Sequence, residues 1–129
     1  MWYDYLDNNK FLITLYESVP QLSNVQITKF AISDSGNRVT IAFKMPIYPN
    51  LPPKKWKGRN YNSAIVEIDF FAISKLNINA NTNYYIGDIE INKIDNKLLA
   101  VKISGKIKSE FQAEAGLIQN IEGYTSIIK

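Results

Sequence analysis

The feature that most constrains the fold is a strict alternation of residue types between residues 106 and 115. Ile107, Phe111 and Ala113 stand in one row with small residues, while lysine, glutamate and glutamine fill the positions between them. Successive side chains of a strand point to opposite faces of a sheet, so this period of two predicts a strand with one buried face. Similar patterns, separated by turn residues, predict strands at 25–32, 38–45, 64–73, 76–80, 85–93, 99–103, 106–115 and 117–128.

Two of these segments carry further detail. The apolar and polar rows change phase between Thr28 and Phe30, which predicts a β-bulge. The segment 64–73 is apolar on both faces apart from Glu67 and Asp69, which is typical of a central strand that is covered on both sides. Asp34 and the three residues after it have the composition of a hairpin turn.

One helix is predicted, from Asp7 to Glu17, because apolar residues recur there at the spacing of one helical face. Asp7 or Asn8 is the predicted N-cap, and Pro20 ends the segment. The fold class that follows is mainly β, or α+β by strict count, with an N-terminal helix packed on a curled antiparallel sheet or sandwich of about seven or eight strands. Residues 1–129 show no repeat or linker and are predicted to form a single domain. The apolar stripe of the helix consists of Phe11, Leu12, Leu15, Tyr16 and Val19.

The chain has no histidine and no cysteine, which removes imidazole, thiol and thiolate-zinc mechanisms. The aspartates lack EF-hand spacing and no glycine-rich loop precedes a helix, so we expect no metal site and no cofactor. The first residues do not resemble a signal peptide, and no segment approaches the roughly 20 apolar residues of a membrane span. We therefore expect a cytoplasmic protein that does not enter a membrane.

The residues best suited to acid–base chemistry are two pairs of carboxylates, each pair on one face of a predicted strand. In principle such pairs serve glycoside hydrolysis. The preferred interpretation is that they line a solvated or salt-bridged sheet face, with Arg38 and Lys44 as partners on a neighbouring strand. The pairs are Glu67 with Asp69 and Asp88 with Glu90.

The main local concentration of positive charge follows a proline-rich stretch. Lysine and arginine beside aromatic rings suit phosphate contact with base stacking, or the centre of a protein interface. In the alternative interpretation, Trp56 anchors the loop while the lysines are only solvated. This segment is the first candidate for a contact surface. Its residues are Lys54, Lys55, Trp56, Lys57, Arg59 and Tyr61.

The proline-rich stretch 45–56 is also the most distinctive part of the sequence. Together with the opening Met1-Trp2-Tyr3, Leu15-Tyr16, the segment 19–22 and the turn 34–36, it resembles the Immunity protein 50 family of bacterial polymorphic toxin systems. The resemblance covers residues 1 to about 73 and is thinner beyond, with Ala72 where the family leads us to expect glycine. It implies a small, mostly β antidote that binds a toxin made by the same cell, and it assigns no contact residues.

The resulting prediction is an immunity protein, not an enzyme, which neutralises a cognate toxin encoded nearby by stoichiometric binding. A basic toxin would select the acidic residues 67, 69, 88 and 90 as the contact, and an acidic toxin would select the segment 54–61. A small nucleic-acid-binding module is the alternative, although a net charge of +3 is modest for that role. A carboxylate-based carbohydrate enzyme ranks last, and the oligomeric state stays open.

Overall fold

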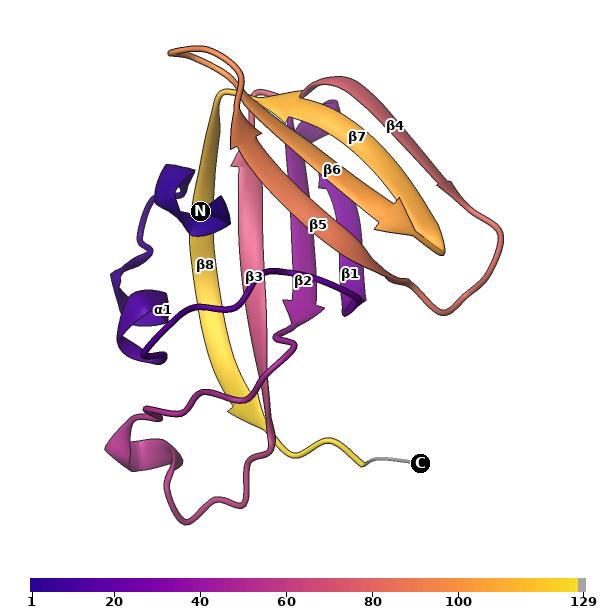
Figure 1. Cartoon of the computed structure of the whole chain (residues 1–129). Coiled ribbons are helices and arrows are strands. Elements are labelled where there is room, and N and C mark those ends of the chain that lie inside the picture. The colour runs from indigo at the N-terminus through magenta and orange to yellow at the C-terminus, as the bar shows by residue number, and fades with distance from the viewer. Residues whose placement is uncertain (128–129) are drawn as a thin grey trace.

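The computed structural model describes residues 1–127, which contain eight antiparallel strands joined in one open sheet (Figure 1). The order across the sheet is β4-β7-β6-β5-β1-β2-β3-β8, so β4 and β8 form its edges. The prediction of a mainly β fold with about seven or eight antiparallel strands is confirmed. The strands are β1 (Val25–Ser33), β2 (Arg38–Lys44), β3 (Ser63–Phe71), β4 (Ser74–Ala80), β5 (Ile86–Lys93), β6 (Leu99–Gly105), β7 (Ile107–Ala113) and β8 (Ala115–Tyr124).

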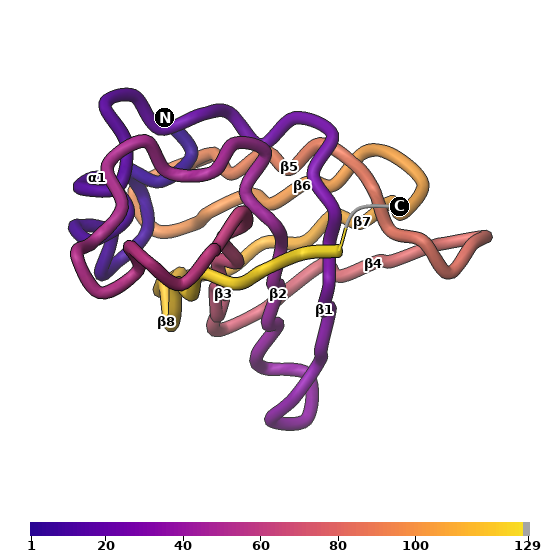
Figure 2. Tube along the Cα trace, turned by 90° about the horizontal axis from the view of Figure 1, so that it is seen from below, coloured from indigo at the N-terminus to yellow at the C-terminus, as the bar shows by residue number. Residues whose placement is uncertain are grey.

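The sheet is curled so that its two halves face each other. Strands β1, β2, β3 and β8 form one layer, and β5, β6, β7 and β4 cross it in Figure 1. Figure 2 shows β5 and β6 lying to one side of β2, β3 and β8. On one side the layers are joined by two residue pairs between β1 and β5, at Val25 and Gln26. On the other side, β3 leads into β4 through residues 72–73, and β7 leads into β8 through Glu114.

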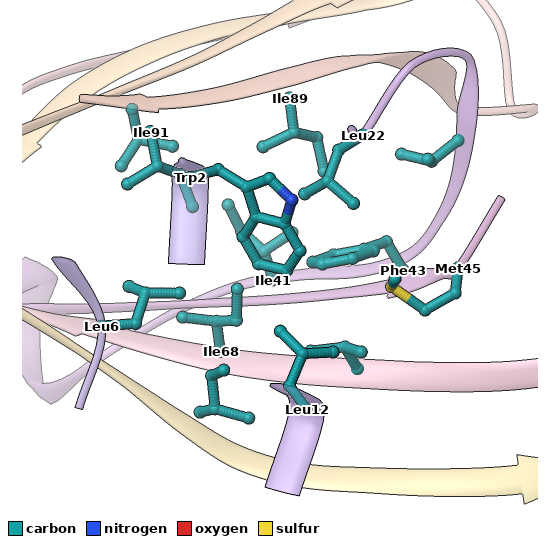
Figure 3. Packing of buried hydrophobic residues seen from close by; sticks show 14 of the residues in the cluster. Trp2, Leu6, Leu12, Leu22, Ile41, Phe43, Met45, Ile68, Ile89 and Ile91 are labelled. Carbon is teal, nitrogen blue, oxygen red and sulfur yellow. The ribbon is translucent and has the colours of Figure 1, made fainter. Parts of the chain in front are cut away.

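Apolar side chains from the inner faces of both layers fill the space between them (Figure 3). Trp2 lies among Ile89 and Ile91 of β5 in this core. Its ring meets that of Phe43 in β2 edge-on, with 6.0 Å between the ring centroids. The indole N–H donates a hydrogen bond of 3.0 Å to the carbonyl of Pro20, so the polar group of the buried ring is satisfied. The N-terminal segment is thereby tied into the core.

The α-helix of the N-terminal segment, α1 (Lys10–Thr14), is shorter than the predicted helix over 7–17. Leu12 and Leu15 of the predicted apolar stripe are buried, whereas Phe11 keeps 40% of its surface exposed. The helix therefore packs on the sheet as predicted, but its predicted length is wrong. No helix within residues 1–127 is long and apolar enough to cross a membrane.

The predicted N-cap is also wrong, because Asn9 occupies that position. Asp7 instead forms a bridge with the edge strand β8: its N–H donates to the carbonyl of Gly116, and its carbonyl accepts from the N–H of Ile118. Asn8 has a φ of 61° and donates from its side chain to the carbonyl of Ile118. These contacts hold residues 7 and 8 in a non-helical conformation where the local sequence favours a helix.

Several local features of the strands agree with the sequence. The register of β1 against β2 shifts between Ile27 and Lys29, which confirms the predicted bulge. The predicted turn contains the 3₁₀ segment η2 (Asp34–Gly36). Strand β3 ends at Phe71, because Ala72 adopts a φ of 57° in the left-handed region that glycine tolerates best. Ala72 is the position at which the family resemblance leads us to expect glycine.

The strand predicted at 106–115 is divided at Glu114 into the end of β7 and the start of β8. The N–H of Glu114 donates to the carbonyl of Phe71, at the corner where the chain passes from one layer to the other. The alternation continues through this corner, so the sequence does not reveal it. Strand β8 ends at Tyr124, so the strand predicted to Ile128 is too long: residues 125–127 are not in a strand, and Ile128 lies outside the described residues.

Candidate functional site

The connection between β2 and β3 is the longest in the described chain and carries the predicted basic segment. Its first half is fixed against the exit of α1. The Tyr16 hydroxyl donates to the carbonyl of Ile47 at 2.6 Å, and the N–H of Leu51 donates to the carbonyl of Leu15 at 3.0 Å. Burial, with the neighbouring Tyr48, raises the pKa of Tyr16, so this hydroxyl keeps its proton at neutral pH and remains a donor.

Trp56 ends the short 3₁₀ segment η3 (Lys54–Trp56) and anchors the second half of the connection. Only 7% of its surface is exposed. Its ring meets Phe11 of α1 and Tyr61 edge-on, with centroids 6.3 and 5.9 Å away. Gly123 of β8 lies against the Trp56 and Tyr61 rings: a Cβ added there would stand 2.5 Å from the Tyr61 ring and 3.0 Å from the Trp56 ring. A glycine in β8 therefore makes room for the anchor.

The cations around Trp56 point to solvent. Lys54, Lys55, Lys57 and Arg59 are all exposed, and none forms an ion pair with a carboxylate of residues 1–127. The structure therefore agrees with the interpretation in which Trp56 anchors the loop and the lysines are solvated, and a contact role for the segment stays a prediction.

Exposed apolar side chains lie at the same end of the molecule. Ile47 is 61% exposed, Leu51 48% and Phe11 40%. A groove of about 470 Å³ runs between this loop and β8, and its lining includes Phe11, Lys55, Tyr61 and Gly123. We call this region the loop surface, and it consists of Phe11, Ile47, Leu51, Lys54, Lys55, Lys57 and Arg59.

The first pair of predicted acidic residues lies on the outer face of β3. Glu67 pairs with Lys29 of β1, with 3.5 Å between Oε1 and Nζ. Asp69 is 5% exposed, and its two oxygens accept hydrogen bonds from the Thr40 hydroxyl at 2.5 Å and the Gln119 amide at 2.8 Å. Both carboxylates are thus engaged within the sheet.

The ion-pair partners predicted for this face are wrong. Arg38 pairs with Asp34 at 3.3 Å and lies over the Phe71 ring at 5.1 Å. Lys44 lies opposite Ile65 and forms no ion pair within the described chain. Lys29 takes the predicted role: it lies opposite Ala42 of β2, which in turn lies opposite Glu67 of β3, so the lysine side chain reaches across β2 to the carboxylate.

The second acidic pair lies on the outer face of β5, in the other layer. Asp88 accepts a hydrogen bond of 2.6 Å from the backbone N–H of Asn24. Glu90 lies opposite Lys102 of β6, and both carboxylates line a groove of about 370 Å³ beside Gln21. Because the inner faces of the two layers face each other, the outer faces of β3 and β5 point in opposite directions. The four acidic residues therefore do not form one contact face.

These arrangements offer little for catalysis or metal binding. Within residues 1–127, no group of three or more aspartates and glutamates is placed to hold a metal ion. The predicted Glu67 and Asp69 pair lies on a sheet face, with three of its four oxygens engaged by neighbouring side chains.

Comparison with known proteins identifies the family. The family model of Immunity protein 50 matches residues 8–124, which is nearly the whole chain. The chain belongs to the Immunity protein 50 family. The resemblance drawn from the N-terminal half is therefore confirmed, and the match extends through β8.

No curated protein matches this Immunity protein 50 chain. Among solved structures it is similar to the crystal structure of an uncharacterized protein from Neisseria gonorrhoeae. The two share 20% identity with a TM-score of 0.49, over 78% of this chain and 91% of that chain.

Membership of the Immunity protein 50 family implies a toxin as the binding partner and fits a protein that acts without catalysis. The apolar part of its loop surface was missed by the sequence interpretation, which placed Phe11 in the buried stripe and gave Ile47 and Leu51 no role. A signal was available for Ile47 and Leu51. They are apolar residues between prolines, outside any predicted strand or helix, where side chains are least expected to be buried.

Proposed function

We propose that this protein is an immunity protein that neutralises a cognate bacterial toxin by stoichiometric protein–protein binding. The single observation that carries the proposal is the family match over residues 8–124. The toxin is encoded by a neighbouring gene and is met in the cytoplasm, before it is delivered to other cells. The immunity protein blocks the toxin by occupying its surface and changes no covalent bond.

The geometry supports binding in a second way. A pinned loop with exposed cations and apolar side chains is pre-organised for contact, so little conformational entropy is lost on association. Nucleic-acid binding is less favoured, because Trp56 is 7% exposed and its faces are covered. A ring in that position does not stack on a base.

Co-expression tests the proposal directly. The product of the adjacent gene is expressed in a sensitive host with and without this protein, and growth is measured. We expect restored growth and a complex that co-purifies. The matched control is Phe43→Asp, which places a charge in the core at a position with 0% exposure and destroys the fold. Growth arrest despite abundant soluble wild-type protein would refute the proposal.

A further inference from the structure

The loop surface concentrates positive charge that the protein itself does not neutralise. Four cations lie within six residues, at 54, 55, 57 and 59, and none is paired within residues 1–127. Elsewhere, Lys29, Arg38 and Lys102 each have a carboxylate within 4.0 Å. Other lysines of the described chain also form no ion pair, but no other stretch of six residues holds four cations. Glu122 in β8 is the carboxylate that lines the groove beside the loop, and it leaves the surface with an excess of positive charge. The charge of this surface is therefore available to a partner.

The same surface has the composition of an interface centre. Phe11, Ile47 and Leu51 expose large apolar side chains, and Phe11 lines the same groove as Lys55. Protein interfaces combine a centre enriched in aromatic residues and arginine with a polar, solvated rim, and the lysines of this surface suit the rim. In Figure 1 the loop lies directly beneath α1, away from β4 to β7, and Figure 2 places both on the same side of the molecule. Contacts of Trp56 with Phe11 fix the loop against the helix.

The acidic alternatives are less available. Glu67 is paired with Lys29, and the buried Asp69 accepts two hydrogen bonds. Asp88 is held by the backbone of Asn24. Three of the four candidate carboxylates thus stabilise this fold, and the two pairs face opposite ways. A basic toxin would find no continuous acidic surface among these four residues.

We infer that the loop surface is the face that contacts the toxin, and that the toxin presents an acidic surface with an apolar centre. This inference rests on the proposed function and specifies its partner. Attraction between opposite charges accelerates the encounter, and the apolar side chains exclude water once contact is made. The pinned backbone keeps both sets of side chains in place before the toxin arrives.

The test reverses the charge of the loop surface and measures the affinity for the product of the adjacent gene. The loop variant carries K54E, K55E, K57E and R59E, which changes the formal net charge from +3 to −5. The matched control makes the same change with four exposed lysines in the other layer. They are Lys93, Lys97, Lys106 and Lys108.

We expect the loop variant to bind about 100-fold more weakly, chiefly through slower association, and to lose most of its salt dependence. The control, with the same net charge, should weaken binding by less than about 10-fold, through long-range steering alone. Ile47→Ala combined with Leu51→Ala should weaken binding by about 10-fold through faster dissociation. All substituted side chains are exposed, so urea unfolding should give wild-type midpoints for each variant.

Each other outcome contradicts the inference in a recognisable way. Wild-type affinity in the folded loop variant, or a larger loss in the control, would place the toxin elsewhere while the proposed function stands. Absence of binding by the wild-type protein would remove the proposed function and this inference together. Binding of a single-stranded oligonucleotide at low salt that is lost in the loop variant would assign the surface to nucleic acid instead.

Discussion

Replacing Trp56 by alanine removes the anchor of the loop surface without changing its charge. In protein cores, truncation of tryptophan to alanine costs about 3–5 kcal/mol. Trp56 is nearly as buried as a core residue, with 7% exposure, and three aromatic rings lie around it. The backbone hydrogen bonds of residues 53–59 are local to that segment, so without the ring this half of the loop can relax into part of the vacated space. We therefore expect a loss near the lower limit, about 3 kcal/mol.

The buried area of the Trp56 side chain gives an upper limit for the loss of stability that is consistent with this value. A buried tryptophan removes roughly 150–250 Å² from water, which at about 25 cal/mol per Å² corresponds to about 4–6 kcal/mol. Real unfolded chains already cover part of that area, so the measured value should be smaller.

Urea unfolding, monitored by tryptophan fluorescence, measures this loss of stability. Trp2 remains as a reporter in the Trp56→Ala variant, because it is buried in the core between the layers. With a slope of about 2 kcal/mol per M, the midpoint should fall by about 1.5 M. Tyr84→Ala, at an aromatic residue that is 49% exposed, is the matched control and should change stability by less than about 0.5 kcal/mol. A loss below about 1 kcal/mol in the Trp56 variant would refute the anchoring role.

Three further substitutions test other parts of the structure. Gly123→Ala should cost about 1–2 kcal/mol, because the new Cβ stands 2.5 Å from the Tyr61 ring, and the cost should largely disappear in a Tyr61→Ala background. Ala72→Gly should raise the free energy of unfolding by about 0.5–1 kcal/mol by relieving the left-handed backbone, and an unchanged urea midpoint would contradict this. Burial raises the pKa of Tyr16 above its ordinary 10.0, so stability is fully present below pH 10 and falls above it as the unfolded chain loses a proton that the folded chain retains. Tyr16→Phe should reduce that decline by up to about 1.4 kcal/mol per pH unit. If the urea midpoint of the variant falls with pH as steeply as that of the wild type, the assignment to Tyr16 is refuted.

The strands were predictable because their signal is local. A period of two and the turn residues between segments depend on neighbouring positions, and the bulge between Ile27 and Lys29 left a visible change of phase. The helix was predicted too long because its first turn competes with the bridge between Asp7 and β8. That competitor lies more than a hundred residues away and leaves no mark on the local pattern.

The candidate site was predictable only in part, for a related reason. Alternation shows which residues share a face of one strand, but not which layer that strand joins, so the carboxylates of β3 and β5 were read as one face. The burial of Trp56 depends on the space left by Gly123 in a distant strand. The basic segment was recognisable because its charges adjoin in sequence, whereas its apolar neighbours come from α1 and from an earlier part of the loop.

The central claim is that this protein acts by occupying the toxin and not by modifying it. The most direct measurement is a titration of toxin activity with purified immunity protein, with toxin held well above the dissociation constant. Binding predicts a linear loss of activity that ends at one equivalent, with active toxin recovered when the complex is separated in denaturant and refolded. Complete inactivation by far less than one equivalent would indicate catalytic turnover, and full activity at molar excess would exclude this toxin as the partner.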